Sequence, residues 1–316
     1  MNEVMMDMQM KRMMLIVNPK AGKCRGVKRL SDMIQTIQDH GYLPTVLLTG
    51  KNGDARRFAH DHGGGAEVVC CAGGDGTFSE VVAGMVEAQH HAPIGYIPAG
   101  SVNDYASSLG LSLDLCQAAS DAVDGVAQSF DIGSLNGRPF AYVAAFGSLA
   151  RVSYSAPQDL KNVLGHFAYV LEGICDLHML RAQSVSIDTD DEHIEGEYLL
   201  GTISNSTSIG GILRFDSSEA KMDDGYLELL LISMPATMWE LAEIVQALST
   251  RSYSGCRCIT YRKSRKVSIV SDSPLPWTLD GEYADDSRCA EIENIPNAIR
   301  VMRPKGAAEK DTSVAQ

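Results

Sequence analysis

The chain has 316 residues, of which 45% are hydrophobic and 21% charged, and its formal net charge at pH 7 is −13. This length is enough for two domains with hydrophobic cores, the composition is ordinary for a soluble globular protein, and the negative charge argues against nucleic acid as a partner. No apolar run is long enough for a signal peptide or a membrane span, and the eight cysteines form no CxxC pair, so we expect a cytoplasmic protein with reduced thiols.

Strands and helices alternate over the first part of the chain. Short apolar runs predict strands, and apolar residues at helical spacing predict helices between them. The expected strands are Met13–Val17, Leu43–Leu48, Glu67–Ala72 and Ile94–Ile97, and the expected helices are Val27–His40, Asp54–His62 and a segment that carries Val81, Val82, Met85 and Val86. Repeated βα units of this length imply a parallel sheet with helices on both faces, and ligands bind such sheets beyond the carboxyl ends of the strands.

After about Asp131, strand-like runs dominate the sequence. The expected strands are Phe140–Phe146, Val185–Ile187, Tyr198–Ser204, Tyr226–Ile232, Val267–Val270 and Ile299–Met302, interrupted by helices at Leu160–Leu177 and Met238–Leu248. This pattern indicates a second domain built on a largely antiparallel sheet or sandwich. We therefore expect an α/β domain over residues 11–133, a β-sandwich-like domain over residues 134–303 and a disordered tail over residues 304–316.

The most informative segment is Val68–Glu80, which has the pattern of a buried strand, a glycine-rich turn and a helix. The glycines of the turn, Gly73–Thr77, let the backbone approach a ligand closely. The start of the helix offers unpaired N–H groups to a phosphate. Asp75 would repel a phosphate on its own, but it suits this turn if a divalent cation or a nucleophilic hydroxyl lies between them. The segment therefore indicates phosphoryl transfer.

Three further segments supply the other groups that such a reaction needs. Asn18–Lys23 is a small-residue turn with lysine, Gly100–Asp104 carries a hydroxyl, a carboxamide and a carboxylate, and Leu279–Glu282 places two acids at a tight turn. Phosphoryl transfer to an alcohol uses N–H donors, a cation and a carboxylate that accepts the hydroxyl proton. Each segment alone could equally be a turn or a helix cap. A P-loop and a dinucleotide fingerprint are both excluded, because Cys24 and Ser79 stand where those motifs require other residues.

Together and in this order, the motifs resemble those of the diacylglycerol kinase catalytic-domain family of lipid kinases, which includes soluble bacterial diacylglycerol kinases and sphingosine and ceramide kinases. The resemblance covers about residues 11–303. It implies an ATP-binding α/β domain followed by a β-sandwich domain that binds the lipid substrate, with the active site in the cleft between the domains.

The resemblance also implies roles for individual residues. Glu282 is similar to the general base of the family, and Asp75 and Asp104 are similar to the acids that organise the catalytic magnesium ion. The implied nucleotide-binding residues are Asn18, Pro19, Lys20, Ala21, Gly22, Lys23, Thr49, Gly73, Gly74, Asp75, Gly76, Thr77, Phe78, Ser79, Glu80, Ser101 and Asn103. Ser101 stands where family members often carry threonine, and Ser79 stands where they often carry asparagine.

Three segments of the second half have two interpretations each. Lys221, Asp224 and Tyr226 resemble a structural magnesium site of the family, in which the aspartate side chain and two backbone carbonyls bind the ion; the alternative is a plain Asp-Gly turn. The basic run Arg262–Lys266 is either a solvated strand edge or a contact for an anionic headgroup. The apolar stretch Val163–Leu177 either packs in the core or lines an acyl-chain pocket.

The function implied is an ATP-dependent lipid kinase of phospholipid biosynthesis, which converts diacylglycerol to phosphatidic acid with ATP and Mg²⁺ as cofactors. Its partners would be a lipid with a free hydroxyl and, by peripheral contact, a membrane surface, and a homodimer is possible. Two alternatives stay open. An NAD kinase-like enzyme also uses a GGDGT turn, and a regulatory protein could bind ATP without turnover.

Overall fold

The computed structural model describes residues 10–147, 181–209, 213–214, 220–253 and 255–306. The chain divides into two compact units, unit 1 of Met1–Ser129 with Ile299–Gln316, and unit 2 of Phe130–Ala298. The helix expected at residues 160–177, with its proposed acyl-chain pocket, lies outside the described residues. Of the tail expected at residues 304–316, only residues 304–306 are described. No helix among the described residues is long and apolar enough to cross a membrane.

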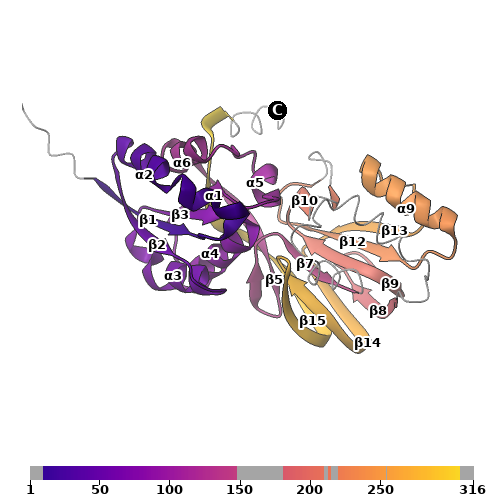
Figure 1. Ribbon diagram of the computed structural model, residues 1–316. Coiled ribbons are helices and arrows are strands. Elements are labelled where there is room, and N and C mark those ends of the chain that lie inside the picture. The colour runs from indigo at the N-terminus through magenta and orange to yellow at the C-terminus, as the bar shows by residue number, and fades with distance from the viewer. Residues whose placement is uncertain (1–9, 148–180, 210–212, 215–219, 254, 307–316) are drawn as a thin grey trace, which may run out of the picture. The chain divides into compact units, whose positions relative to one another are not determined.

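Unit 1 is built on a parallel sheet. Its strands are β1 (Lys11–Val17), β2 (Tyr42–Leu48), β3 (Val68–Gly73) and β4 (Ile94–Pro98), in the order β4-β3-β1-β2. Helices α2 (Leu30–Asp39) and α6 (Leu115–Asp124) cover one face, and α3 (Asp54–His62) and α4 (Asp75–Glu87) cover the other (Figure 1). The predicted α/β class of the first half is confirmed, and the carboxyl ends of all four strands meet at one edge of the sheet.

The apolar runs of the sequence explain this sheet. Every residue of β3 is buried, as is every residue of β1 from Met13 onward, because helices cover both faces of the sheet. Helix α2 buries Met33 and Ile37, which are four residues apart on one side of the helix. The single helix expected at residues 27–40 is instead two, α1 (Arg25–Lys28) and α2, because Arg29 leaves helical geometry with φ −111°.

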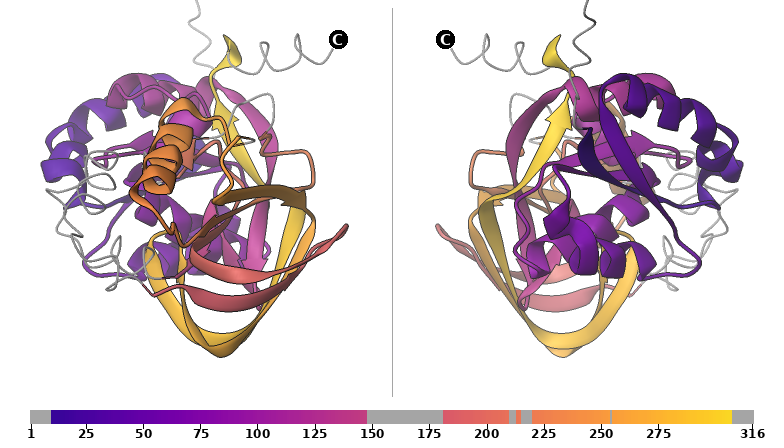
Figure 2. Two further views of the ribbon diagram at one scale, coloured as in Figure 1. Left: turned by 90° about the vertical axis from the view of Figure 1, so that its right-hand side faces the viewer. Right: turned by 90° about the vertical axis from the view of Figure 1, so that its left-hand side faces the viewer.

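Unit 2 is mainly antiparallel, as predicted. Its strands include β7 (Val143–Phe146), β8 (Gln183–Asp188), β9 (His193–Ser204), β12 (Leu227–Ser233), β13 (Ile259–Ser264), β14 (Lys266–Leu279) and β15 (Glu282–Arg303). They pair in the order β13-β12-β9-β7-β14-β15, and β8 pairs with both β14 and β9. The long strands β14 and β15 bend (Figure 2), and their register shifts between Val270 and Leu275.

The core of unit 2 lies among these strands. It includes Phe146 and Trp277, whose ring centroids are 5.1 Å apart, together with Leu229 and Leu231 of β12. Helix α9 (Met238–Thr250) of unit 2 matches the helix expected at residues 238–248, and the side chain of Thr237 caps its start by accepting a hydrogen bond from the Glu240 amide.

The end of β15 returns to unit 1. Val301 pairs in parallel with Ile94 of β4, and the guanidinium of Arg303 donates to the Leu109 carbonyl at 2.8 Å and to the Gln128 side chain at 2.8 Å. Ile299–Gln316 therefore belongs with unit 1, whereas the second domain was expected to extend to residue 303. Just beyond the end of β15, the ammonium of Lys305 forms an ion pair with Asp124 at 2.9 Å.

Candidate active site

Three of the loops predicted to bind phosphate, those after β1, β3 and β4, lie side by side at the carboxyl edge of the unit 1 sheet, together with the loop after β2 that carries Thr49. The Asn18 amide donates to the Ala72 carbonyl at 2.9 Å, and the Thr49 amide donates to the Val17 carbonyl at 3.0 Å. The Ala99 amide donates to the Gly73 carbonyl at 2.8 Å. The ends of β1, β2, β3 and β4 are thus tied together by backbone hydrogen bonds, and the loops that follow them start from adjacent positions.

The loop after β1 is fixed against its neighbours by polar contacts. The side-chain amide of Asn18 donates to the Thr77 hydroxyl at 2.9 Å, and its carbonyl oxygen accepts from the Lys20 amide at 3.0 Å. At Gly22, where φ is +49°, an added Cβ would lie 2.1 Å from the Ala99 carbonyl oxygen. Only glycine allows the backbone of the loop after β1 to pass this close to the loop after β4, which carries Ala99.

The glycine-rich turn leads directly into α4. Its N-cap, Gly74, has no side chain to cap the helix, so the amides of the first turn point out of the helix without a capping oxygen. The helix dipole places a partial positive charge at this end, which favours the binding of an anion. At Gly100 in the facing loop, an added Cβ would lie 2.5 Å from Gly74 Cα, so the two turns pack backbone to backbone.

Asp75 connects this turn with the loop after β4. Its carboxylate accepts from the Asp104 amide at 3.1 Å and from the Tyr105 amide at 3.1 Å, which are the first residues of α5 (Asp104–Ser108). The hydroxyl of Tyr96 lies 3.4 Å from the same carboxylate. Burial raises the pKa of Asp75 to about 6, and the charge of Asp104 adds to this rise, whereas the Tyr105 amide opposes it. In this structure Asp75 therefore holds two loops together.

Two residues expected to bind nucleotide have other contacts. The Glu80 carboxylate accepts from the Gly53 amide at 2.9 Å and the Ala55 amide at 3.0 Å, so it caps the start of α3. The ring of Phe78 is fully buried, with centroids 4.6 Å from Tyr96 and 4.7 Å from Tyr105. These contacts show that Glu80 and Phe78 support the loops structurally. The motif alone did not reveal this role.

The other expected nucleotide contacts differ in their exposure. Lys20, Lys23 and Ser101 are exposed, whereas Thr49 and Asn103 are buried. Asn103 has a φ of +59° and its side chain donates to the Gly100 carbonyl at 3.1 Å. The exposed residues are therefore the ones that can reach a ligand with their side chains.

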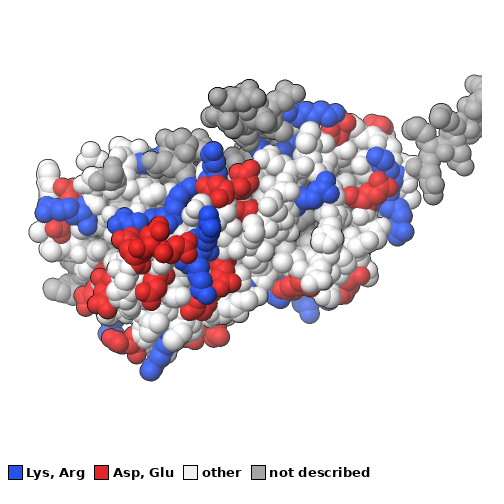
Figure 3. All heavy atoms as spheres, turned by 180° about the vertical axis from the view of Figure 1, so that it is seen from behind, with Lys and Arg blue, Asp and Glu red and all other residues white. Residues whose placement is uncertain are grey.

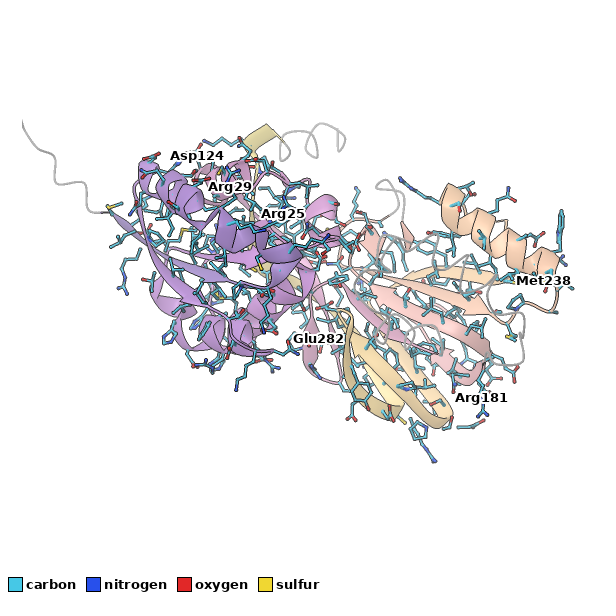
Figure 4. The ribbon with its side chains drawn as sticks, viewed as in Figure 1. Arg25, Arg29, Asp124, Arg181, Met238 and Glu282 are labelled. Atoms are coloured by element: carbon cyan, nitrogen blue, oxygen red, sulfur yellow. The ribbon has the colours of Figure 1, made fainter. Side chains whose placement is uncertain are left out.

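Glu282 lies in unit 2, at the start of β15 (Figure 4). It follows a two-residue turn, Asp280–Gly281, in which both residues have positive φ, 51° and 84°, as a tight hairpin turn requires. The Asp280 carboxylate accepts from the Ala141 amide at 2.7 Å and from the Tyr142 and Val143 amides at 3.0 Å each. Asp280 thus fixes the turn, and Glu282 is the half-buried acid that the turn presents.

The loop expected to bind a structural magnesium ion also lies in unit 2. One oxygen of Asp224 accepts from the Tyr226 amide at 3.1 Å, and the other accepts from the Lys263 ammonium at 2.7 Å. A magnesium ion held by Asp224 and the carbonyls of Lys221 and Tyr226 would share the Asp224 carboxylate with Lys263, and this site stays a prediction. Burial raises the pKa of the neighbouring Glu228 to about 8, against the charge of Lys263. Within the described ranges, no three His, Cys, Asp or Glu side chains converge as a metal site.

The basic run Arg262–Lys266 has internal partners. Arg262 pairs with Glu192, and Lys266 pairs with Glu291 at 3.2 Å and Glu293 at 2.9 Å. The guanidinium of Arg265 stacks 4.9 Å from the Tyr226 ring centroid. Figure 3 shows Lys and Arg side chains interleaved with Asp and Glu on the face that it draws. These internal partners are what the solvated-strand interpretation expects, and the contact with an anionic headgroup stays a prediction.

Comparisons with known proteins decide the family. The family described as diacylglycerol kinase catalytic domain matches residues 12–135, and the family described as YegS C-terminal NAD kinase beta sandwich-like domain matches residues 142–303. A diacylglycerol kinase of Staphylococcus saprophyticus is 34% identical over 295 residues, which is 93% of this chain and 96% of that protein. The chain belongs to the diacylglycerol kinase catalytic-domain family. This family membership identifies a kinase and confirms the predicted resemblance.

A further relative agrees with this assignment, and a solved structure shows the same fold. A diacylglycerol kinase of Bacillus subtilis is 31% identical over 303 residues, covering 95% of this chain and 99% of that protein. A crystal structure of a diacylglycerol kinase from Bacillus anthracis matches with a TM-score of 0.74 at 21% identity, covering 94% of this chain and 98% of that one. The predicted fold class, an α/β domain followed by a β-sandwich domain, is thereby confirmed.

Proposed function

We propose that the protein transfers the γ-phosphate of ATP to a lipid hydroxyl, with diacylglycerol as the expected acceptor and phosphatidic acid as the product. The convergence of four loops at the carboxyl edge of the unit 1 sheet, around the uncapped start of α4, carries this proposal. It is the arrangement that phosphate groups favour in open α/β sheets. The names of the relatives, which are diacylglycerol kinases, support the choice of acceptor.

The phosphates of ATP would bind at this edge. The amides of the glycine-rich turn and of the first turn of α4 would donate to phosphate oxygens, as in other phosphoryl-transfer sites. Lys20 and Lys23 are exposed on the loop after β1, and their ammonium groups would add positive charge. The magnesium ion that accompanies ATP as part of the substrate would neutralise further phosphate charge, and Asp75 and Asp104 are the residues that would hold it.

Glu282 would act as the general base. Its carboxylate would take the proton of the lipid hydroxyl while that oxygen bonds to the γ-phosphorus and the bond between the γ-phosphorus and ADP breaks. The three hydrogen bonds that Asp280 accepts keep the turn rigid, which suits a group that must meet its proton in one geometry. This proposal requires unit 1 and unit 2 to act on the same phosphate.

The lipid substrate would come from a bilayer. We therefore expect peripheral contact with a membrane surface from the cytoplasmic side, and turnover should need diacylglycerol in vesicles or mixed micelles. This expectation rests on the substrate class, because a long-chain diacylglycerol is not available as a monomer in water.

The proposal can be tested by incubating the protein with radiolabelled ATP, Mg²⁺ and mixed micelles of diacylglycerol, with NAD in a parallel reaction. We expect labelled phosphatidic acid and no labelled NADP. Labelled NADP alone would favour the NAD kinase-like alternative, to which the description of the second-domain family points. ATP binding with no labelled product from diacylglycerol, NAD or a total lipid extract would favour the regulatory alternative.

A further inference from the structure

Helix α9 of unit 2 has one side that the packing of the unit does not use. The buried residues recur every three or four positions, so they share one side of the helix; they are Leu241, Ile244, Ala247 and Leu248. The exposed residues are Met238, Trp239, Ala242, Gln246, Ser249 and Thr250. None of these six carries a charge, so the exposed face of α9 is an uncharged surface in contact with solvent.

The start of this face is strongly apolar. The side chain of Met238 (Figure 4) is 65% exposed and that of Trp239 is 74% exposed, the two highest values for large hydrophobic residues in the part of the chain that the structure describes. Single exposed apolar residues are common, but two adjacent ones of this size form a patch. The indole N–H of Trp239 donates to Glu243 at 3.0 Å. A ring of this kind, apolar with one polar group, suits the boundary between water and hydrocarbon.

The other end of α9 is cationic. Arg251 is the C-cap of the helix, Arg257 lies in the loop that follows, and both are exposed. The two acids of the helix have N–H partners, because Glu240 accepts from the Ala236 amide at 2.6 Å and Glu243 accepts from the indole. This local positive charge in a chain with a net charge of −13 complements anionic lipid headgroups.

The size of the exposed face favours a bilayer over a protein as the partner. A helix of 13 residues is about 20 Å long and about 10 Å wide, so one face of it offers roughly 200 Å². A stable protein interface buries about 800 Å² on each partner. Contact with a bilayer needs less, since a few inserted apolar side chains and attraction to the headgroups are enough for reversible binding.

We infer that the exposed face of α9 is the surface through which this protein contacts a lipid bilayer. Met238 and Trp239 enter the boundary between headgroups and acyl chains, and Arg251 and Arg257 lie against anionic headgroups. The inference rests on the proposed function, because a diacylglycerol acceptor has to be reached in a bilayer. It adds the residues that make the contact.

Tryptophan fluorescence tests this inference directly. The chain has two tryptophans, and Trp277 is only 1% exposed, so Trp239 is the reporter. The full-length protein, without ATP, is titrated with vesicles of phosphatidylcholine and phosphatidylglycerol in equal amounts. We expect the emission to shift to shorter wavelength, and vesicles with brominated acyl chains to quench it. In Trp239→Phe only Trp277 remains, and its emission should not respond to vesicles.

Sedimentation with the same vesicles measures the contribution of each group. Met238→Ser combined with Trp239→Ser should weaken binding about tenfold or more, because two apolar side chains no longer leave water. Val270→Ser is the matched control, since Val270 is a 50% exposed apolar residue of the same unit, and it should bind as the wild type does. Arg251→Gln and Arg257→Gln should each weaken binding about fivefold, and neither should alter binding to vesicles of phosphatidylcholine alone.

Trp239 emission that stays unchanged at high vesicle concentration would overturn the inference, as would an equal loss of binding in Val270→Ser. A shift that appears on raising the protein concentration without vesicles would assign the face to a second copy of the chain instead. The double serine variant should phosphorylate a water-soluble short-chain diacylglycerol at the wild-type rate. Failure of vesicle binding would leave that activity in place, whereas vesicle binding without any phosphorylation would contradict the proposed lipid kinase activity alone.

Discussion

Asp75 combines two roles that the motif alone does not separate. Its carboxylate is half-buried and accepts from the first amides of α5, and in the proposed reaction it also binds the magnesium ion of the substrate. Both roles need the ionised form. Because burial raises the pKa of this group to about 6 from its ordinary 3.8, ionisation occurs within the range in which activity can be measured.

We therefore predict an acid limb in the pH profile of the lipid kinase reaction. Below about pH 6, Asp75 becomes protonated and kcat/KM should fall about tenfold per pH unit, since kcat/KM reports the ionisations of the free enzyme. The variant Asp75→Asn should be at least 10²-fold slower at all pH values and lack this limb. A wild-type kcat/KM that is flat between pH 5 and pH 7 would contradict the assignment.

The same pKa shift acts on stability with the opposite sign. The folded protein retains the Asp75 proton up to about pH 6, whereas the unfolded chain loses it near 3.8. Between these values the folded state binds more protons, so the contribution of this group to the free energy of unfolding decreases as pH rises from about 4 to about 6. Keeping Asp75 ionised in its partly buried position therefore lowers the free energy of unfolding.

At the level of elements, the loops after the four parallel strands form one packed layer. The loop after β1 passes so close to the loop after β4 that Gly22 has no room for a side chain. The predicted phosphate contacts of Asn18–Lys23 depend on this close approach, because it sets where the lysines of the loop lie relative to α4.

We predict that Gly22→Ala disturbs this layer. The added methyl group would meet the Ala99 carbonyl and the backbone would need a positive φ, so the loop must shift, and the KM for ATP should rise about tenfold or more. Gly41→Ala is the matched control, because Gly41 also has a positive φ, +80°, but an added Cβ meets no atom within 4 Å. It should lower stability by about 1 kcal/mol with an unchanged KM.

If the two alanine variants raise the KM for ATP equally, then the effect comes from the backbone conformation alone. The loop after β1 would in that case have no special part in nucleotide binding.

For the molecule as a whole, the sequence predicted local elements better than it predicted contacts between distant residues. The apolar runs of β1, β3 and β4 and the helical spacing in α3 predicted those elements within one or two residues, because burial on both faces of a sheet requires uninterrupted apolar sequence. The GGDGT turn predicted a loop suited to phosphate for a similar reason, since its glycines and helix start act locally.

Contacts between distant residues could not be read in this way. That Glu80 caps α3, that Asp280 anchors three amides, and that Lys263 meets Asp224 all depend on strand register and on which side chain turns inward. The return of β15 to pair with β4 is of the same kind. An isolated strand at Ile299–Met302 was predicted, but its partner lies about 200 residues earlier in the chain.

The central claim is that Glu282 of unit 2 accepts the proton when a phosphate bound on unit 1 is transferred. Glu282→Gln preserves the size of the side chain and the turn that Asp280 fixes, and removes the base. The direct measurement is the rate of phosphate transfer from labelled ATP to diacylglycerol in mixed micelles, together with the Kd for ATP. We expect kcat to fall 10²–10⁴-fold while the Kd for ATP stays within about twofold of the wild-type value. A variant that keeps more than about a tenth of the wild-type rate would contradict this role for Glu282.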